Sequence, residues 1–111
     1  AGLVALTSNI AQEYGPRIRA NCVSPGVIRT PMSETLFSAP QLLDPFLDAN
    51  PADRAGTAAD VASLFVFLAS DESSYLNGQN LVLDGGGGLA QPGIDDVLRF
   101  AVPPLEPRKK D

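Results

Sequence analysis

The residues best placed to do chemistry in this sequence surround a Pro-Gly pair, Pro25-Gly26, which Thr30 follows four residues later. Residues 18–23, just before the pair, are β-compatible, so the pair is predicted to turn the backbone at the carboxyl end of a strand. Open parallel sheets bind their ligands outside the carboxyl ends of strands. Gly26 has no side chain to keep a flat ligand from the backbone, and Thr30 offers a hydroxyl. An ordinary strand-to-loop turn accounts for these residues equally well.

The segments on either side of this turn predict a βαβ unit. A helix is predicted over residues 1–14, because apolar side chains recur three or four positions apart, at Leu3, Leu6, Ile10 and Tyr14. Thr57 and Asp60 have the spacing of a capping box, which predicts a helix from there to about residue 70. Residues 79–83 then alternate as a second strand. Two strands joined through a helix are expected to be parallel, with a right-handed connection.

Residues 30–55 are irregular and apolar, with prolines at positions 31, 40, 45 and 51. Short helical segments with an apolar face are expected there, and they are expected to form a flap over the neighbouring turn. Its large apolar side chains include Met32, Leu36, Phe37 and Phe46. They suit the wall of a pocket that keeps water from a reaction, and they suit plain packing on the sheet equally well.

Composition narrows the classes of function. The formal net charge is -5 and the pI is near 4.5, which argues against a nucleic-acid surface. The single cysteine, Cys22, permits no internal disulfide and favours a reducing, cytoplasmic setting. Histidine is absent, the aspartates are scattered, and no apolar stretch reaches the roughly 20 residues of a membrane span. Neither a metal site nor a membrane or nucleic-acid partner is therefore expected.

Three ordered motifs resemble the short-chain dehydrogenase/reductase family. Residues 19–30 resemble the stretch that follows the family's catalytic helix, and residues 3–15 resemble the end of that helix. The third motif runs from Arg54-x-Gly56 and Asp60 through residues 68–79 to Asp84-Gly85-Gly86. The resemblance covers residues 1–88 and implies an α/β fold, the C-terminal part of a Rossmann-like doubly wound parallel sheet. Residues 89–111 are expected to form an irregular tail with one short helix near residues 94–100.

The resemblance also implies a cofactor, NAD or NADP, and a set of residues to hold it. In the family the Pro-Gly turn lies against the nicotinamide ring, and the carboxamide bonds the backbone two residues further on. Carried over, the cofactor-binding residues are Pro25, Gly26, Val27, Ile28 and Thr30, while Met32, Leu36, Phe37 and Phe46 fall in the substrate lid. Hydride transfer between nicotinamide and a small carbonyl or alcohol substrate is implied, in a homo-oligomer, usually a dimer or tetramer.

The departures from the family pattern are equally informative. The family's glycine-rich loop and its catalytic Ser, Tyr and Lys would all precede residue 1, and neither Tyr14 nor Tyr75 has a Lys four residues later. We therefore name no catalytic residue, and expect the chain to be an inactive piece of a longer enzyme. A non-catalytic piece that keeps the family's subunit-contact surface is the alternative. A divergent enoyl reductase or epimerase fits the spacing from Asn21 to Gly26 less well.

A second glycine-rich run also resembles a cofactor-binding motif. The run Gly85-x-Gly87-x-x-Ala90 formally fits a dinucleotide fingerprint and follows a strand. That fingerprint requires a helix to open at once, and Pro92-Gly93 argues against one. The run is interpreted as the family's terminal glycine turn.

Overall fold

The computed structural model describes residues 1–89 of the chain. They form an α/β arrangement, with the elements α1 (Gly2–Tyr14), β1 (Cys22–Pro25), β2 (Ile28–Arg29), α2 (Glu34–Phe37), α3 (Pro40–Ala49), β3 (Gly56–Thr57), α4 (Ala58–Ala69) and β4 (Asn80–Leu83). Short 3-10 turns follow α4 and β4, at Asp71–Ser73 and Gly87–Leu89. The predicted tail helix near residues 94–100 lies outside the described residues.

The predicted parallel pairing is confirmed. β1 pairs with β4 in parallel, in a register that runs from Cys22 opposite Asn80 to Pro25 opposite Leu83. A second, unpredicted parallel pair joins β2 to β3. The first strand was predicted over residues 18–23, but it spans Cys22–Pro25. Before it, the amide of Ala20 donates to the side chain of Asn77 and not to a neighbouring strand.

Three side chains at the amino-terminal rim explain that late start. The Arg19 guanidinium donates hydrogen bonds of 2.7–3.3 Å to the carbonyl oxygens of residues 68, 70, 73 and 76. Asn21 donates to the Leu76 carbonyl (2.9 Å) and accepts from the amide of Gln79 (3.1 Å). Asn77 accepts from the amide of Ala20 at 2.9 Å. These contacts tie the entrance of β1 to the segment that joins α4 to β4.

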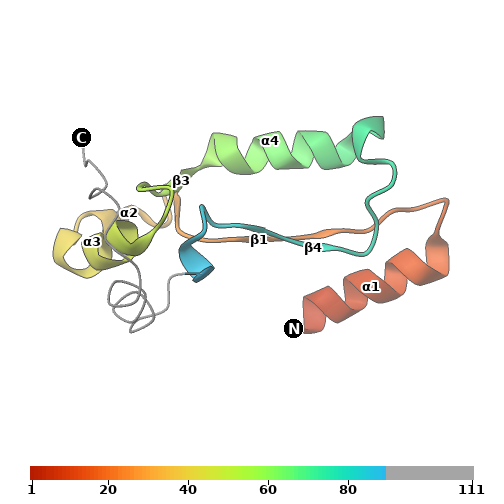
Figure 1. The fold of residues 1–111 in the computed structure, drawn as a ribbon, viewed down its shortest axis with the longest axis horizontal. Coiled ribbons are helices and arrows are strands. Elements are labelled where there is room, and N and C mark those ends of the chain that lie inside the picture. Colours follow the sequence, from red (N-terminus) through yellow and green to blue (C-terminus); the bar gives the residue numbers. More distant parts are fainter. Residues whose placement is uncertain (90–111) are drawn as a thin grey trace, which may run out of the picture.

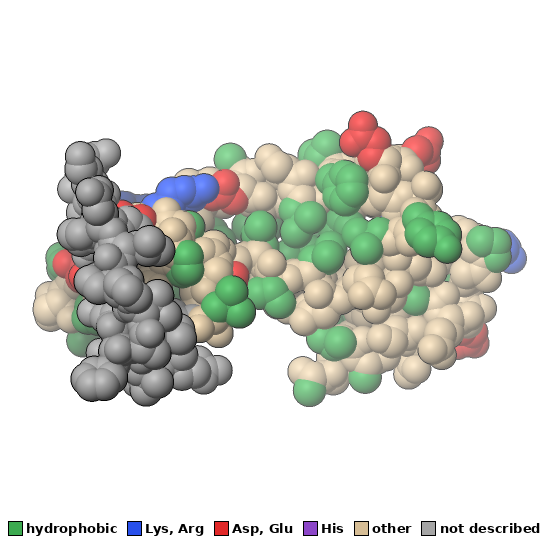
Figure 2. Space-filling view, in the orientation of Figure 1, with side chains coloured by type: hydrophobic (Ala, Val, Ile, Leu, Met, Phe, Trp, Pro, Cys, Tyr) green, Lys and Arg blue, Asp and Glu red, His purple; other side chains and the backbone are tan. Residues whose placement is uncertain are grey.

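The two long helices lie on opposite sides of the β1–β4 pair, α4 on one side and α1 on the other (Figure 1). Successive strand side chains point to opposite faces, so Val23, Leu81 and Leu83 share one face. Leu83 lines a cavity together with Ser63 of α4, which makes that shared face the one toward α4. Hydrophobic side chains gather in the layer between α4 and the strands (Figure 2).

Helix α1 forms as predicted but presents a different face to the sheet. Thr7 and Ala11 are buried, whereas Leu3 is 66% exposed and Leu6 and Tyr14 are also exposed. Small side chains allow a helix backbone to lie close to a strand, and the Thr7 hydroxyl is satisfied by the carbonyl of Leu3 at 2.8 Å. Three of the four residues of the apolar stripe are therefore exposed, while Ile10 is half-buried.

Little apolar surface is fully buried in residues 1–89. The buried hydrophobic residues there are Ala11, Cys22 and Leu43, while Phe65, Val66 and many others are exposed. The elements form an open stack of layers and not a closed core. Within the same part of the chain, no helix combines the length and apolar character that crossing a membrane would require.

Candidate functional site

The predicted turn lies at the carboxyl edge of the β1–β4 pair. β1 ends at Pro25 and β4 ends at Leu83, its register partner. The amide of Gly26 donates to the carbonyl of Leu83 at 2.9 Å, so the ladder continues one step past the strands. The two turns that leave this edge, at Pro25-Gly26 and Asp84-Gly85, consequently lie side by side.

Gly26 is needed here for the approach of the two strand ends. A Cβ atom on Gly26 would lie 2.7 Å from the Cβ and 3.0 Å from the Cα of Asp84. These separations are well below an ordinary carbon–carbon contact of about 3.5–4.0 Å. The space that a side chain would fill is thus occupied by Asp84, a close approach that the sequence did not reveal. The solvent side of the turn is open, since Pro25, Gly26 and Val27 are all exposed.

The backbone beyond the turn is held by a serine. The Ser33 hydroxyl accepts from the amide of Thr30 at 2.8 Å and donates to the carbonyl of Ile28 at 2.8 Å. The amide of Ser33 lies 3.3 Å from the Thr30 hydroxyl and 3.1 Å from the Thr30 carbonyl. Ile28 and Thr30 are both half-buried, and both belong to the predicted cofactor-binding set. Ser33 was not predicted, although the Thr-x-x-Ser spacing of hydroxyls was visible.

A cavity of about 220 Å³ opens beside this backbone, on the α4 side of the strands. Predicted residues Val27 and Ile28 line it, whereas Pro25, Gly26 and Thr30 do not. Its remaining walls come from the segment before β3, the first turns of α4 and the end of β4, with residues Ala52, Arg54, Gly56, Asp60, Ser63, Leu83, Asp84 and Gly85. Two of the predicted cofactor-binding residues therefore line this cavity, and its other lining residues were not predicted from the sequence.

Asp84 and Asn50 fix the turn that faces Gly26. The Asp84 carboxylate accepts from the amides of Gly88 and Gly86, each at 2.9 Å, and these bonds lower the pKa of the Asp84 carboxyl. Asn50, which is buried, donates to the carbonyl of Asp84 at 3.0 Å and accepts from the amide of Ala52 at 2.8 Å. The loop after α3 is thus fastened to the end of β4. The Asn50-Pro51 dipeptide, a turn signal, was the available sequence evidence.

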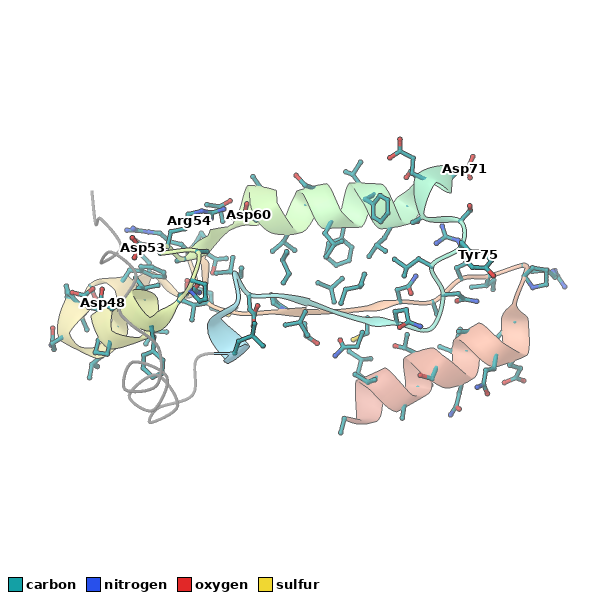
Figure 3. All side chains as sticks on the ribbon, in the orientation of Figure 1. Asp48, Asp53, Arg54, Asp60, Asp71 and Tyr75 are labelled. Carbon is teal, nitrogen blue, oxygen red and sulfur yellow. The ribbon has the colours of Figure 1, made fainter. Side chains whose placement is uncertain are left out.

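The capping box of α4 is confirmed and is extended by an arginine. Thr57 and Asp60 exchange the two expected bonds, and Arg54 pairs with the Asp60 carboxylate at 2.7 Å, beside the start of α4 (Figure 3). The hydrogen bond from Arg54, followed by the backbone and side-chain bonds from Thr57, holds the pKa of the Asp60 carboxyl well below its usual range. Arg54 also lines the cavity, so it places a positive charge at the pocket edge.

The predicted lid residues are placed unequally. Phe37 is half-buried, lies 4.7 Å under the Arg29 guanidinium and lines a second cavity of about 430 Å³ against α3. Met32 is 94% exposed, and Leu36 and Phe46 are also exposed. Of the four, Phe37 is therefore the one with a described place in a cavity wall, while the lid role of all four stays a prediction.

Other chemistry finds little support in the part of the chain that is described. No group of His, Cys, Asp or Glu side chains there could hold a metal ion. Tyr14 and Tyr75 are exposed, and Tyr75 lies at the end of α4 away from the cavity (Figure 3). Cys22 is buried in β1 as a free thiol. Gly87–Leu89 forms a 3-10 turn, while Ala90, the last position of the possible dinucleotide fingerprint, lies outside the described residues.

The chain is similar to known proteins in both sequence and structure. A family model described as enoyl-(acyl carrier protein) reductase matches residues 1–87. The 3-oxoacyl-(acyl-carrier-protein) reductase of Chlamydia pneumoniae is 46% identical over 87 residues, 78% of this chain and 34% of that protein. A 4-hydroxyisoleucine dehydrogenase complexed with NADH superposes with a TM-score of 0.76 at 36% identity, over 81% of this chain and 37% of that one. A candidate 2-deoxy-D-gluconate 3-dehydrogenase of Agrobacterium tumefaciens with bound NADP superposes with a TM-score of 0.75 at 35% identity, over 81% of this chain and 37% of that one.

The chain belongs to the short-chain dehydrogenase/reductase family, and its strands and helices are part of that family's Rossmann-like fold. It spans about a third of the length of the curated relatives that it matches. The descriptions of these matches name an enoyl reductase, a 3-oxoacyl reductase and a 4-hydroxyisoleucine dehydrogenase, so the matches define the family and not one reaction.

Proposed function

We propose that these residues form the nicotinamide side of a pyridine-nucleotide site, in an oxidoreductase that moves a hydride between NAD or NADP and a small carbonyl or alcohol compound. The observation that carries the proposal is the open turn at the carboxyl ends of β1 and β4. Relatives of similar fold hold NADH and NADP, which supports the class of cofactor without choosing between the two.

The exposed turn suits a flat, amide-bearing ring. Pro25, Gly26 and Val27 offer an apolar edge to the ring, while the carbonyl of Ile28 and the hydroxyl of Thr30 offer polar partners to its carboxamide. A bound nicotinamide supplies or accepts the hydride. The residues of this chain bind the ring, orient it and, through lid residues such as Phe37, exclude water.

We also propose that the 111 residues by themselves do not turn over substrate. The two tyrosines are exposed, and both lysines, Lys109 and Lys110, lie far along the sequence from either of them. A tyrosine acts as a proton donor when a neighbouring lysine lowers the pKa of its phenol. Residues 1–88 are proposed as the part that belongs to the nucleotide-binding domain, with residues 89–111 as a separate tail.

Nucleotide oxidation tests these proposals. The protein as its gene encodes it (the natural protein) is mixed with NADH or NADPH and a panel of small ketones and aldehydes. The loss of reduced nucleotide is followed by absorbance. Consumption of one nucleotide is expected for the natural protein, and none for the 111 residues alone. A natural protein that neither consumes nor binds either nucleotide would contradict the proposed function.

The alternative function is a non-catalytic assembly piece. The exposed apolar stripe of α1, with Leu3, Leu6 and Tyr14, favours it, and the same stripe supports a homo-oligomer in either case. Self-association in sedimentation experiments, without any nucleotide binding, is the result that would favour this function over the enzyme. A cytoplasmic location is proposed from the free, buried thiol of Cys22.

A further inference from the structure

Ser33 makes hydrogen bonds that its position in the chain does not require. A serine just before a helix usually accepts from an amide of the helix's first turn. Ser33 precedes α2, yet its side chain makes no such bond. Its two short bonds run backward instead, at 2.8 Å each, to the amide of Thr30 and to the carbonyl of Ile28. The hydroxyl therefore organises the backbone before the helix and not the helix itself.

These two partners are the ends of the backbone that faces the proposed ring. A hydroxyl has one hydrogen to donate and two lone pairs to accept with, so Ser33 can hold Thr30 and Ile28 at once. The Thr30 hydroxyl donates to the Ser33 hydroxyl at 3.3 Å and accepts from the Ser33 amide at 3.3 Å. The carbonyl of Ile28 has a second lone pair, which leaves it able to accept from a ligand amide while it is bonded to Ser33.

We propose that Ser33 is a positioning residue for the cofactor. It holds the Ile28 carbonyl and the Thr30 hydroxyl in the arrangement that a nicotinamide carboxamide meets, and it ties that arrangement to α2 at the start of the lid. This inference rests on the proposed function. It adds a residue that does not itself touch the nucleotide and a link between cofactor binding and the placement of the lid helix.

Three variants of the natural protein test the inference. Ser33→Ala removes the hydroxyl, and Ser33→Thr keeps it. Ser38→Ala removes a hydroxyl from the other end of α2, where it donates only to the carbonyl of Thr35 at 2.6 Å. The readouts are the dissociation constants of NADH and NADPH, measured by fluorescence, and the hydrogen exchange of the Thr30 amide.

Ser33→Ala is expected to weaken binding of the preferred nucleotide about tenfold and to speed exchange at Thr30, because two backbone groups lose their partner. Ser33→Thr and Ser38→Ala should stay near the wild-type values in both measurements. Faster exchange with unchanged nucleotide affinity would show a purely structural serine, and would overturn the inference while the proposed function stands. Absence of nucleotide binding in the wild type would refute the proposed function, and the inference with it.

Discussion

Substituting Gly26 by alanine is expected to push the two strand ends apart. The new methyl carbon would lie 2.7 Å from the Cβ and 3.0 Å from the Cα of Asp84. To reach an ordinary contact, the two turns must separate by about 0.8 Å. The backbone of Asp84 resists that movement, because Asn50 holds its carbonyl at 3.0 Å and two glycine amides hold its carboxylate.

The magnitude follows from what the separation breaks. Overpacking in a closely packed site costs about 1–3 kcal/mol. The hydrogen bond from the Gly26 amide to the Leu83 carbonyl, 2.9 Å long, would be stretched beyond a useful length, which costs about 1 kcal/mol more. Replacing glycine by alanine returns about 0.4–1 kcal/mol by stiffening the unfolded chain. A net loss of about 1–3.6 kcal/mol in the free energy of unfolding is therefore expected.

Urea unfolding of the natural protein measures this loss, with Gly2→Ala as the matched control. A Cβ on Gly2 meets nothing within 4 Å, so that variant should be as stable as the wild type or slightly more so. Hydrogen exchange of the backbone amide at position 26 should also be faster in Gly26→Ala than in the wild type. Equal stability of the two alanine variants would refute the close approach of the two turns on which the site is built.

Arg19→Met should lower the free energy of unfolding by about 2–4 kcal/mol, and Arg19→Lys by less, in denaturant titrations, because several charged hydrogen bonds to carbonyl oxygens are lost. Asn21→Asp should cost about 1–3 kcal/mol in the same assay, since a carboxylate cannot donate to the carbonyl of Leu76. Because the pKa of Asp60 is lowered in the folded protein, its carboxylate stabilises the fold fully above about pH 4, and this stabilisation is lost as the pH falls. The difference in stability between wild type and Asp60→Asn, followed by circular dichroism, should therefore narrow in acid. A constant difference would contradict this. The 111 residues alone should unfold at low denaturant or self-associate; a cooperative, monomeric thermal transition at ordinary mesophile temperatures would argue otherwise.

Local sequence signals predicted the elements whose causes are local. The box at Thr57 and Asp60 fixes the start of α4, because its bonds join residues three apart. A strand was predicted over residues 79–83 and β4 spans Asn80–Leu83, while the predicted parallel pairing with β1 follows from the length of the connection. The family resemblance supplied the candidate cofactor residues, which the physical pattern alone left open.

The remaining features depend on contacts between residues far apart in the sequence. β1 starts late because Arg19 bonds carbonyls about 50 residues away, and no local rule anticipates that. The helical periodicity of α1 was correct, but Thr7 and Ala11 face the strand because small side chains allow closer packing there than Leu3 or Leu6 would. The interpretation of Gly26 as room for a ligand stays a prediction, and the structure adds a long-range contact that no local pattern revealed, since a side chain at this position would meet Asp84.

The proposed site makes residues 25–30 one wall of a pyridine-nucleotide pocket. Backbone amide chemical shifts of the natural protein, recorded while NADH or NADPH is added, test it most directly. Saturable shifts concentrated at Gly26, Val27, Ile28 and Thr30 are expected, with the amino-terminal rim at Asn21 and Asn77 unchanged. Saturable binding that leaves residues 25–30 unperturbed, or that shifts the amino-terminal rim instead, would contradict it.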